Sequence, residues 1–272
     1  MPRAPVPLSS ALREFQLQFE AKIASLDLAE KWDNVGFLVE SPRSTAYMRL
    51  RVLACIDLTK KVADEAIKKK CNLILSYHPV LFRPTQSLAL SNKSAVLACL
   101  DAGVSIFSPH TSLDSAENGM NDFLCDIFSS NQDRRRGVKT DPTSGVKVGR
   151  IVEFPEPMKL RDVLLNLKTF LSVDSVRYAG PDCDQEVRSV AVCVGSGSSV
   201  LMGAEADVYL TGEMSHHEIL ACVGLGKAVV LLDHSSSERP FLPELARRVR
   251  KLTMVEEVLV SEEDVEPIRV FR

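Results

Sequence analysis

Apolar residues follow two rhythms along this chain. Runs of about four to eight apolar residues, the length of a buried strand, alternate with segments whose apolar residues recur every three or four positions, as on one face of a helix. The runs predict strands over residues 51–58, 71–79, 104–110, 146–154, 175–180, 188–195, 207–213 and 227–234, and a closing strand or hairpin within 255–271. The periodic segments predict helices over residues 9–23, 59–70, 93–103, 116–128, 158–171, 216–224 and 239–252.

This alternation of strand and helix predicts an α/β fold built of layers, with mostly parallel strands. The polar, turn-rich segment SSNQDRRRGVKTDPTSG divides the pattern into two halves. We therefore expect a first α/β unit over residues 1–130, a linker or mobile loop over residues 131–147, and a second, similar α/β unit over residues 148–272.

The two halves echo each other in organisation. The same shift of 138 residues carries Asp57 onto Gly195 and His78 onto His216. Each half then adds a helix and a third strand that ends at a histidine, His110 or His234. Because the other residues differ, the echo indicates two related units without proving a duplication.

The histidines are confined to the ends of predicted strands. All five lie there, at His78, His110, His216, His217 and His234. In open α/β sheets, the residues just past the carboxyl ends of the strands line the ligand crevice. The glycine-rich run VGSGSSV also follows a strand, and it predicts either an anion-binding turn or simply a tight strand-to-helix turn.

Two of these histidines are followed, four residues later, by a carboxylate: Asp114 follows His110 and Glu238 follows His234. In a first helical turn this spacing places both side chains on one side. Imidazole and carboxylate together suit zinc, iron, manganese or nickel, and two such clusters suit a two-metal site that activates water for hydrolysis. The same residues also fit structural roles, with Asp114 as a helix cap and Glu238 as an acid favoured by a helix dipole.

Composition narrows the class of protein. The 272 residues are 45% hydrophobic and 25% charged, an ordinary globular balance, and the net charge of −3 gives no basic field for direct nucleic-acid binding. The seven cysteines are scattered without a CxxC pair, which favours reduced core thiols over disulfides or a cysteine zinc cage. We expect no membrane span and no secretion signal, so the cytoplasm is the default compartment, with the nucleus and mitochondrion left open.

Five motifs give the chain a family resemblance. KWDNVGFLVE, LILSYHPVLFR, IFSPHTSLDSAENGMND, DVYLTGEMSHHE and LLDHSSSERPFL occur in this order between about Leu28 and Leu242. Together they resemble the NGG-interacting-factor-three-like family, whose bacterial members are labelled type 2 homologs of GTP cyclohydrolase I. The YHP and TGEMSHHE forms look most like the eukaryotic branch.

The resemblance implies two similar α/β domains with a dinuclear metal centre in the cleft between them. It implies metal ligands at His78, Asp114, His234 and Glu238 and one or two divalent transition metal ions (zinc, iron, manganese or nickel) per chain. It also implies a homo-oligomer, either a dimer or a toroidal hexamer made of dimers.

The chain departs from the family pattern at one position. The usual motif has two consecutive histidines where this chain has Tyr77 and His78, so one imidazole ligand is absent, and a tyrosine ligates a metal only as phenolate. Some bacterial relatives carry an inserted middle domain, and the short stretch between Gly149 and Arg188 leaves no room for one here.

Three functions follow as hypotheses. The first is a metal-dependent hydrolase of a small, nucleotide-like molecule, with His110 as the proton shuttle because it ends a strand beside Asp114. The second is a non-catalytic scaffold or transcriptional co-regulator partner with a vestigial metal site, which the substitution at Tyr77 and the association of eukaryotic members with transcriptional co-regulators both motivate. The third is metal storage or chaperoning. The cyclohydrolase label by itself assigns no activity.

Overall fold

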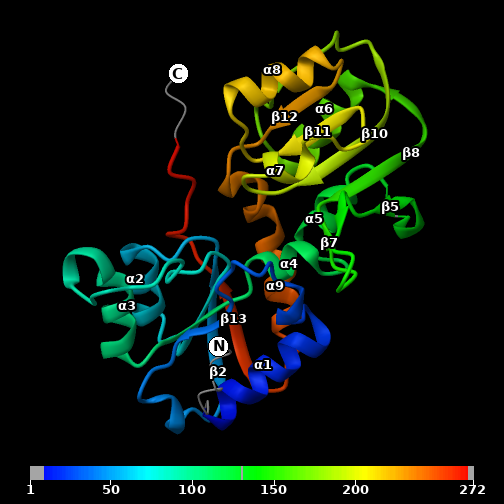
Figure 1. The fold of residues 1–272 in the computed structure, drawn as a ribbon. Helices are drawn as coiled ribbons and strands as arrows, with labels where there is room; N and C mark the ends of the chain where they lie inside the picture. Colours follow the sequence, from blue (N-terminus) through cyan, green and yellow to red (C-terminus); the bar gives the residue numbers. More distant parts are fainter. Residues whose placement is uncertain (1–8, 130, 269–272) are drawn as a thin grey trace. The chain divides into compact units, whose positions relative to one another are not determined.

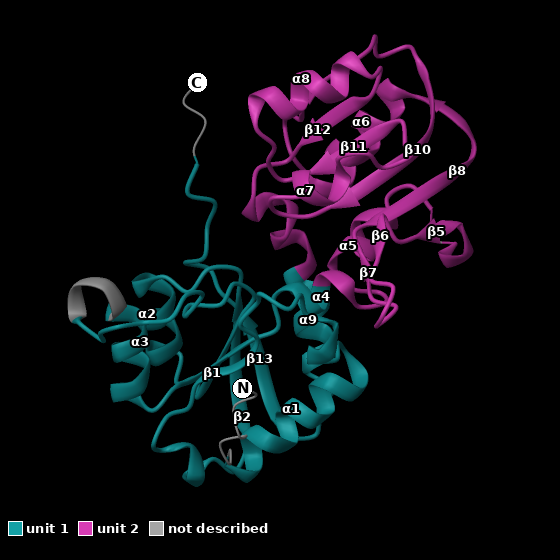
Figure 2. Cartoon of the chain, in the orientation of Figure 1, with its two compact units in different colours: residues 1–113, 242–272 teal, residues 114–241 magenta. Residues whose placement is uncertain are grey.

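The computed structural model describes residues 9–129 and 131–268 and consists of two compact units, each an α/β fold (Figure 1). Unit 1 combines residues 1–113 with residues 242–272, and unit 2 is residues 114–241 (Figure 2). No helix in the described residues has both the length and the apolar character needed to cross a bilayer.

Unit 1 is built on a five-stranded sheet in the order β1-β4-β3-β2-β13. The strands β13, β2, β3 and β4 run parallel, and β1 closes one edge antiparallel to β4. The strands of unit 1 are β1 (Gly36–Val39), β2 (Leu50–Cys55), β3 (Leu73–Ser76), β4 (Ser105–Ser108) and β13 (Val255–Val260). Its helices are α1 (Ser10–Lys22), α2 (Lys60–Lys68), α3 (Leu90–Ala102), the start of α4 (Thr111–Ser115) and α9 (Leu242–Val249), with short 3-10 turns η1 (Leu26–Leu28) and η2 (Ser44–Ala46).

Both faces of this sheet are covered by helices. Leu53, Ile74 and Ile106 point to one face and form a core cluster with apolar residues of α2 and α3. Phe107, the neighbour of Ile106 on β4, points to the opposite face and packs against Phe15 of α1 with ring centroids 5.4 Å apart. Figure 1 shows α2 and α3 on one side of the sheet and α1 and α9 on the other. The parallel strands β2, β3 and β4 are therefore buried on both faces, as their continuous apolar sequences predict.

Helix boundaries in unit 1 follow local signals. Thr59 precedes α2, and its hydroxyl accepts a hydrogen bond from the Val62 backbone N–H at 3.3 Å. Gly103 ends α3 in the left-handed conformation with a φ of +83°, which glycine adopts without a steric penalty. These two helix ends confirm the sequence prediction.

Unit 2 is built on a six-stranded sheet in the order β5-β8-β10-β11-β12-β9. The central strands β10, β11 and β12 run parallel, while β8 and β9 flank them antiparallel. The strands of unit 2 are β5 (Arg135–Arg136), β6 (Lys139–Thr140), β7 (Lys147–Val148), β8 (Arg150–Lys159), β9 (Arg177–Ala179), β10 (Glu186–Cys193), β11 (Val208–Thr211) and β12 (Ala228–Leu231). Its helices are α5 (Met120–Cys125), α6 (Leu160–Leu171), α7 (Ser198–Leu201) and α8 (His216–Gly224), with 3-10 turns η3 (Gln132–Arg134), η4 (Ser235–Ser237) and η5 (Arg239–Phe241).

A buried arginine fastens the start of unit 2 to its sheet. Arg150, the first residue of β8, donates to the Asp122 carboxylate at 2.9 Å and to the carbonyls of Ser115 and Ala116 at 2.9 and 3.1 Å. Arg150 is 3% exposed and Asp122 is 2% exposed. The positive charge of Arg150 is neutralised by Asp122, and its N–H groups donate to the carboxylate and to backbone carbonyls. An ion pair satisfied in this way can be buried without a large free-energy cost.

The contacts divide the chain differently from the expected boundaries. The last segment belongs to unit 1 because β13 pairs in parallel with β2, with Val258 opposite Val52. The expected linker over residues 131–147 lies inside unit 2, where β5 pairs with β8 and β6 pairs with β7. The sequence could not show this, since the pairing of β13 with β2 joins residues about 200 positions apart.

Candidate functional site

His78 is the first of the predicted ligands in unit 1. Asp57 and His78 each lie two residues past the ends of adjacent parallel strands, β2 and β3. The Asp57 Oδ1 and His78 Nδ1 atoms are 2.9 Å apart. Because a carboxylate only accepts hydrogen bonds, this contact assigns the proton to Nδ1 and makes Nε2 the nitrogen suited to binding a metal.

The position of Asp57 is itself fixed by the segment after β13. The Asp264 carboxylate accepts from the backbone N–H of Ile56 at 2.6 Å and from that of Asp57 at 3.3 Å. Asp264 is 5% exposed, so these charge-assisted bonds are shielded from water. The chain that carries Asp57 is therefore held in place independently of His78.

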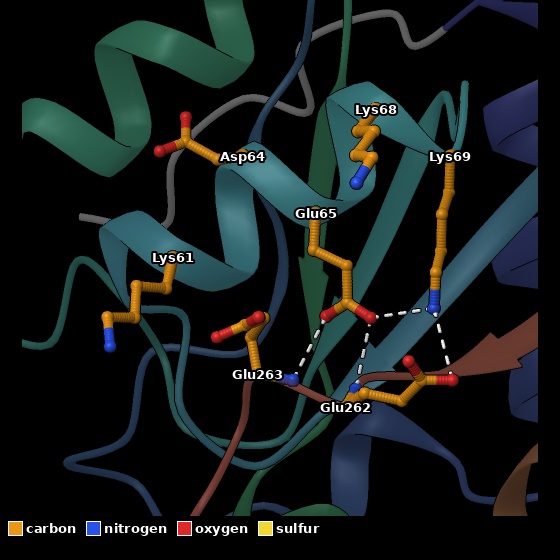
Figure 3. Close-up of a pocket in the computed structure, with 7 residues that line it drawn as sticks. All are labelled: Lys61, Asp64, Glu65, Lys68, Lys69, Glu262 and Glu263. Carbon is orange, nitrogen blue, oxygen red and sulfur yellow. Dashed lines mark hydrogen bonds and ion pairs between the residues drawn. The ribbon is translucent and has the colours of Figure 1, made fainter.

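Glu65 on α2 holds the turn that carries Asp264 (Figure 3). Its carboxylate accepts from Lys69 Nζ at 2.8 Å, from the backbone N–H groups of Glu262 and Glu263 at 3.0 and 3.3 Å, and from the Ser261 hydroxyl. Burial alone would raise the pKa of Glu65, but these hydrogen bonds outweigh burial and lower the pKa from its ordinary 4.5 to about 2.

The pocket in Figure 3 has a volume of about 480 Å³ and is lined by three lysines and four acids of α2 and the segment after β13. Within it, Lys69 pairs with Glu65 and Glu262. The five histidines are not among its lining residues. We therefore interpret Glu65 as support for the site around His78 and not as part of a ligand pocket.

His110 lies two residues past the end of β4 and has a φ of +33°, an uncommon backbone conformation for a residue other than glycine. Its Nδ1 lies 2.8 Å from Asp33 Oδ1. The other oxygen of Asp33 accepts from the Thr111 backbone N–H at 3.1 Å and from the Thr111 hydroxyl at 2.5 Å. The Asp33 side chain is completely buried.

The charge state of Asp33 follows from these contacts. Burial acts to raise the pKa of Asp33, but the hydrogen bonds from His110 and Thr111 and the charge of His110 together lower it below its ordinary value. Asp33 is therefore ionised at neutral pH, and its Oδ1 accepts the hydrogen bond from His110 Nδ1. An imidazole oriented by a buried carboxylate is a common arrangement for a group that moves protons in catalysis.

His234 is the predicted ligand at the corresponding place in unit 2. It follows β12 by three residues and comes directly after Asp233, which has a φ of +66°. Its Nδ1 lies 3.0 Å from Glu213 Oε1, and its Nε2 lies 3.5 Å from Glu238 Oε1. Glu238 is 1% exposed. With the proton on Nδ1, the Nε2 lone pair and the Glu238 carboxylate are both electron-rich, and a cation held by both would relieve their repulsion.

Gly195 keeps a space open beside this pair. A Cβ atom at Gly195 would lie 2.7 Å from Glu238 Oε1 and 3.2 Å from His234 Nε2, closer than side chains normally pack. Gly195 also has a φ of +61°. A metal ion could be held by the imidazole and carboxylate that border this space, so the residues present fit the expected group.

The glycine-rich turn after β10 forms a tight turn and not an anion site. The Gly195 backbone N–H donates to the Ser237 hydroxyl at 2.8 Å, and the Gly197 backbone N–H donates to the Thr211 hydroxyl at 3.0 Å. Both N–H groups therefore have partners within unit 2, which favours the simpler of the two interpretations of VGSGSSV.

Two further residues singled out in the sequence, Asp114 and Tyr77, lie in different surroundings. Asp114 is half-buried on α4, and its backbone carbonyl accepts from Asn121 Nδ2 at 3.1 Å. Tyr77 is 2% exposed, with ring centroids 4.9 Å from His78 and 5.3 Å from His110.

The matching shift of 138 residues holds for only one of the two pairs. Asp57 and Gly195 both lie two residues past their strands, but the residue two past β11 is Glu213, not His216. His216 begins α8 and is exposed. The connection before β11 is shorter, with four residues in α7 against nine in α2, so the register changes by three residues. Glu213, which supports His234, was missed for this reason.

The fold and these contacts define a class: an α/β protein of two units, each of which places imidazole–carboxylate pairs just past its parallel strands. The family model described as Duf34/NIF3 (NGG1p interacting factor 3) matches residues 13–267. The chain belongs to this family, as the sequence motifs predict.

Curated relatives share most of the chain. The protein NIF3 homolog of Schizosaccharomyces pombe is 35% identical over 257 residues, covering 89% of this chain and 91% of the relative. The NGG1-interacting factor 3 of Saccharomyces cerevisiae is 33% identical over 261 residues, covering 89% of this chain and 90% of the relative.

Solved structures share the fold. The Staphylococcus aureus hypothetical protein SA1388 matches with a TM-score of 0.81 at 22% identity, covering 98% of this chain and 100% of that one. Reduced HcgD from Methanocaldococcus jannaschii matches with a TM-score of 0.77 at 22% identity, covering 90% of this chain and 96% of that one. This chain therefore shares its mixed α/β fold with these solved structures.

Proposed function

We propose that this protein is a metal-dependent hydrolase of a small, nucleotide-like molecule. The observation that carries the proposal is the pairing of His78, His110 and His234 with carboxylates through Nδ1, at 2.9, 2.8 and 3.0 Å. Carboxylates of this kind fix the tautomer and orientation of metal-binding and catalytic imidazoles.

The proposed ligands are His78, Asp114, His234 and Glu238. Of these, His78, His234 and Glu238 form a set of the residue types that could hold a metal ion. Of the four proposed ligands, His78 belongs to unit 1 and the other three belong to unit 2. A bound divalent transition metal supplies Lewis acidity and activates water for hydrolysis. Zinc, iron, manganese and nickel all suit such ligands.

His110 is proposed to move the proton during hydrolysis. Its Nδ1 is held by the buried, ionised Asp33, so its Nε2 is the atom that takes up and returns the proton. This role differs from that of the proposed ligands, because it affects turnover without holding the metal.

Elemental analysis of the purified protein tests the proposal. We expect at least about one transition metal ion per chain, and a loss of most of it in His234→Ala and in Glu238→Gln. His217→Ala is the matched control, since His217 is an exposed histidine of the same unit at the start of α8. Thermal unfolding of each variant checks that the fold is retained. His110→Ala should keep the metal and lose hydrolysis of a panel of nucleotides.

Metal content near zero in the unaltered protein, with no change in His234→Ala, would remove the proposal. A metal content that falls equally in His217→Ala would show that binding is not specific to the proposed ligands.

The second candidate is a non-catalytic scaffold or co-regulator partner with a vestigial site. Tyr77 favours it, because a phenol that is 2% exposed supplies a metal ligand only after a costly deprotonation. The name of the yeast relative, NGG1-interacting factor 3, also points to a protein partner. Replacing Tyr77 by His discriminates between the two functions. If the Tyr77→His variant gains a second metal ion and hydrolytic activity, the site of the unaltered protein is a degraded enzyme site, and this result favours the scaffold.

The expected homo-oligomer, a dimer or a hexamer, is part of the same proposal. Light scattering on the purified protein measures its mass, and a monomer at micromolar concentration would contradict it.

A further inference from the structure

Two large aromatic side chains stand exposed beside His110. Trp32 is 57% exposed and Phe82 is 49% exposed, and their ring centroids lie 5.8 Å apart at an interplanar angle of 69°. The imidazole of His110 lies 6.0 Å from Trp32 and 6.2 Å from Phe82, also at steep angles. An exposed pair of aromatic rings next to a polar, functional side chain is a common mark of a binding surface.

The indole ring is held in place despite its exposure. Trp32 Nε1 donates to Glu30 Oε2 at 2.9 Å, and the Glu30 backbone N–H donates to the Thr111 hydroxyl at 3.0 Å. Asp33, the next residue along, is bound to His110 and Thr111. The loop that carries Trp32 is therefore fixed to the same turn that carries His110.

The backbone segment that carries Phe82 is bonded to the same loop. Asn34 Nδ2 donates to the backbone carbonyl of Leu81, the residue before Phe82, at 2.5 Å. The two rings thus sit on separate segments that are bonded to each other and to the His110 turn. A ring pair that is arranged before binding loses little conformational entropy when a ligand arrives.

We infer that Trp32 and Phe82 form an aromatic notch that takes a planar heteroaromatic ring, such as a nucleobase, and so presents the attached part of the substrate to His110. Two rings at 69° allow a flat ring to stack on one ring while its edge meets the other. Stacking accepts any flat conjugated ring, so the notch selects a class of substrate and not one base. The inference rests on the proposed function, because it makes His110 the group that faces the substrate.

The chain offers its own reporter for this notch. Trp32 is the single tryptophan among the 272 residues, so intrinsic tryptophan fluorescence reports on the notch alone. Adding guanosine or adenosine monophosphate to the full-length protein should give saturable quenching. Ribose 5-phosphate, which keeps the sugar and phosphate without a base, should give none. Free tryptophan amide in the same solutions corrects for light absorbed by the bases.

A matched pair of variants tests the geometry. Phe82→Leu keeps the fluorophore and an apolar side chain but removes one ring, and it should weaken nucleotide binding on the order of tenfold. Leu220→Ala changes another exposed apolar residue, on α8, and should leave binding unchanged. Equal quenching by ribose 5-phosphate, no saturable quenching by either nucleotide, or equal binding in Phe82→Leu would each overturn the notch.

The test separates this inference from the metal proposal. His234→Ala keeps Trp32 and Phe82, so a protein without metal should still show base-dependent quenching. Loss of metal in His234→Ala together with absent quenching in the unaltered protein removes only the notch. Saturable quenching in the unaltered protein, together with metal content near zero in that same protein, removes only the proposed hydrolase.

Discussion

Units 1 and 2 share a plan but support their histidines differently. Each has three adjacent parallel strands and a histidine after the third, His110 in unit 1 and His234 in unit 2. In unit 1 the supporting carboxylate, Asp33, is fully buried, whereas in unit 2 the Glu213 side chain is 56% exposed.

The difference shows that the position of each histidine and the burial of its carboxylate partner are set by different residues. The parallel strands bring the histidines to a sheet edge in both units. The burial of the partner then decides how firmly each ring is held, because water and salt weaken an exposed pair far more than a buried one. Asp33 therefore holds His110 of unit 1 more firmly than Glu213 holds His234 of unit 2.

The largest expected effect comes from replacing Arg150, the buried arginine that supports the fold of unit 2. Replacing Arg150 by Ala removes the arginine that donates to the buried Asp122 carboxylate at 2.9 Å and leaves only the more distant Arg135, at 3.8 Å, so we expect the free energy of unfolding to fall by about 3–5 kcal/mol. Denaturant unfolding measures it. Arg136→Ala is the control, because Arg136 is 48% exposed with carboxylates at 3.9 and 4.0 Å, and it should cost about 0.5 kcal/mol or less. Equal losses in the two variants would contradict this assignment.

Glu65 plays the equivalent part in unit 1. Glu65→Gln removes the charge that accepts from Ser261, Glu262 and Glu263, and we expect a loss of about 1–3 kcal/mol in unfolding free energy at neutral pH.

The same variant gives a pH test. The folded-state pKa of Glu65, about 2, lies below its ordinary 4.5, so the stabilisation by Glu65 is complete above pH 4.5 and is lost as the pH falls towards 2. The stability gap between the unaltered protein and Glu65→Gln should therefore close over this range. Glu244, whose pKa the adjacent Arg247 and Arg248 also hold at about 2, leaves some acid sensitivity in both proteins. A gap that stays constant down to pH 2 would contradict the assignment.

The smallest expected effect is a difference in metal affinity between variants of Asp57 and Glu213, the carboxylates that accept hydrogen bonds from the proposed metal ligands His78 and His234. Asp57→Ala and Glu213→Ala should each weaken metal binding, within a range of about 10- to 100-fold. Asp57 should lie at the upper end, because Asp264 fixes its backbone, and the exposed Glu213 at the lower end. Competition with a metal chelator measures both. A larger effect for Glu213 would reverse the comparison between the units.

The sequence predicts the elements well and their long-range partners poorly. The apolar runs around Val52, Ile74 and Ile106 are continuous because both faces of their sheet are buried, and this makes the strands recognisable. The return of β13 to β2 leaves no local signal, because any parallel, apolar strand could occupy that edge.

The candidate site likewise combines residues that the sequence predicts with residues that it does not. The strand-end positions of His78, His110 and His234 are predictable because each follows a strand-like run by two or three residues, and Glu238 is predicted as a ligand from its spacing of four residues after His234. Asp264 is not predictable, since it comes about 200 residues after the Ile56 backbone that it holds. Glu213 was hidden by the shorter connection before β11, which shifts the two halves out of register.

The order of the strands also has a consequence for synthesis of the protein. Unit 2 is encoded between the two parts of unit 1, so during translation it emerges whole before β13 has left the ribosome. Domains fold as units as they emerge. Unit 2 can thus reach its fold early, whereas the five-stranded sheet of unit 1 lacks its edge strand β13, and the loop of Asp57 lacks Asp264, until residues 255–264 are made. Chaperone demand should therefore concentrate on the exposed edge of β2 in the nascent chain.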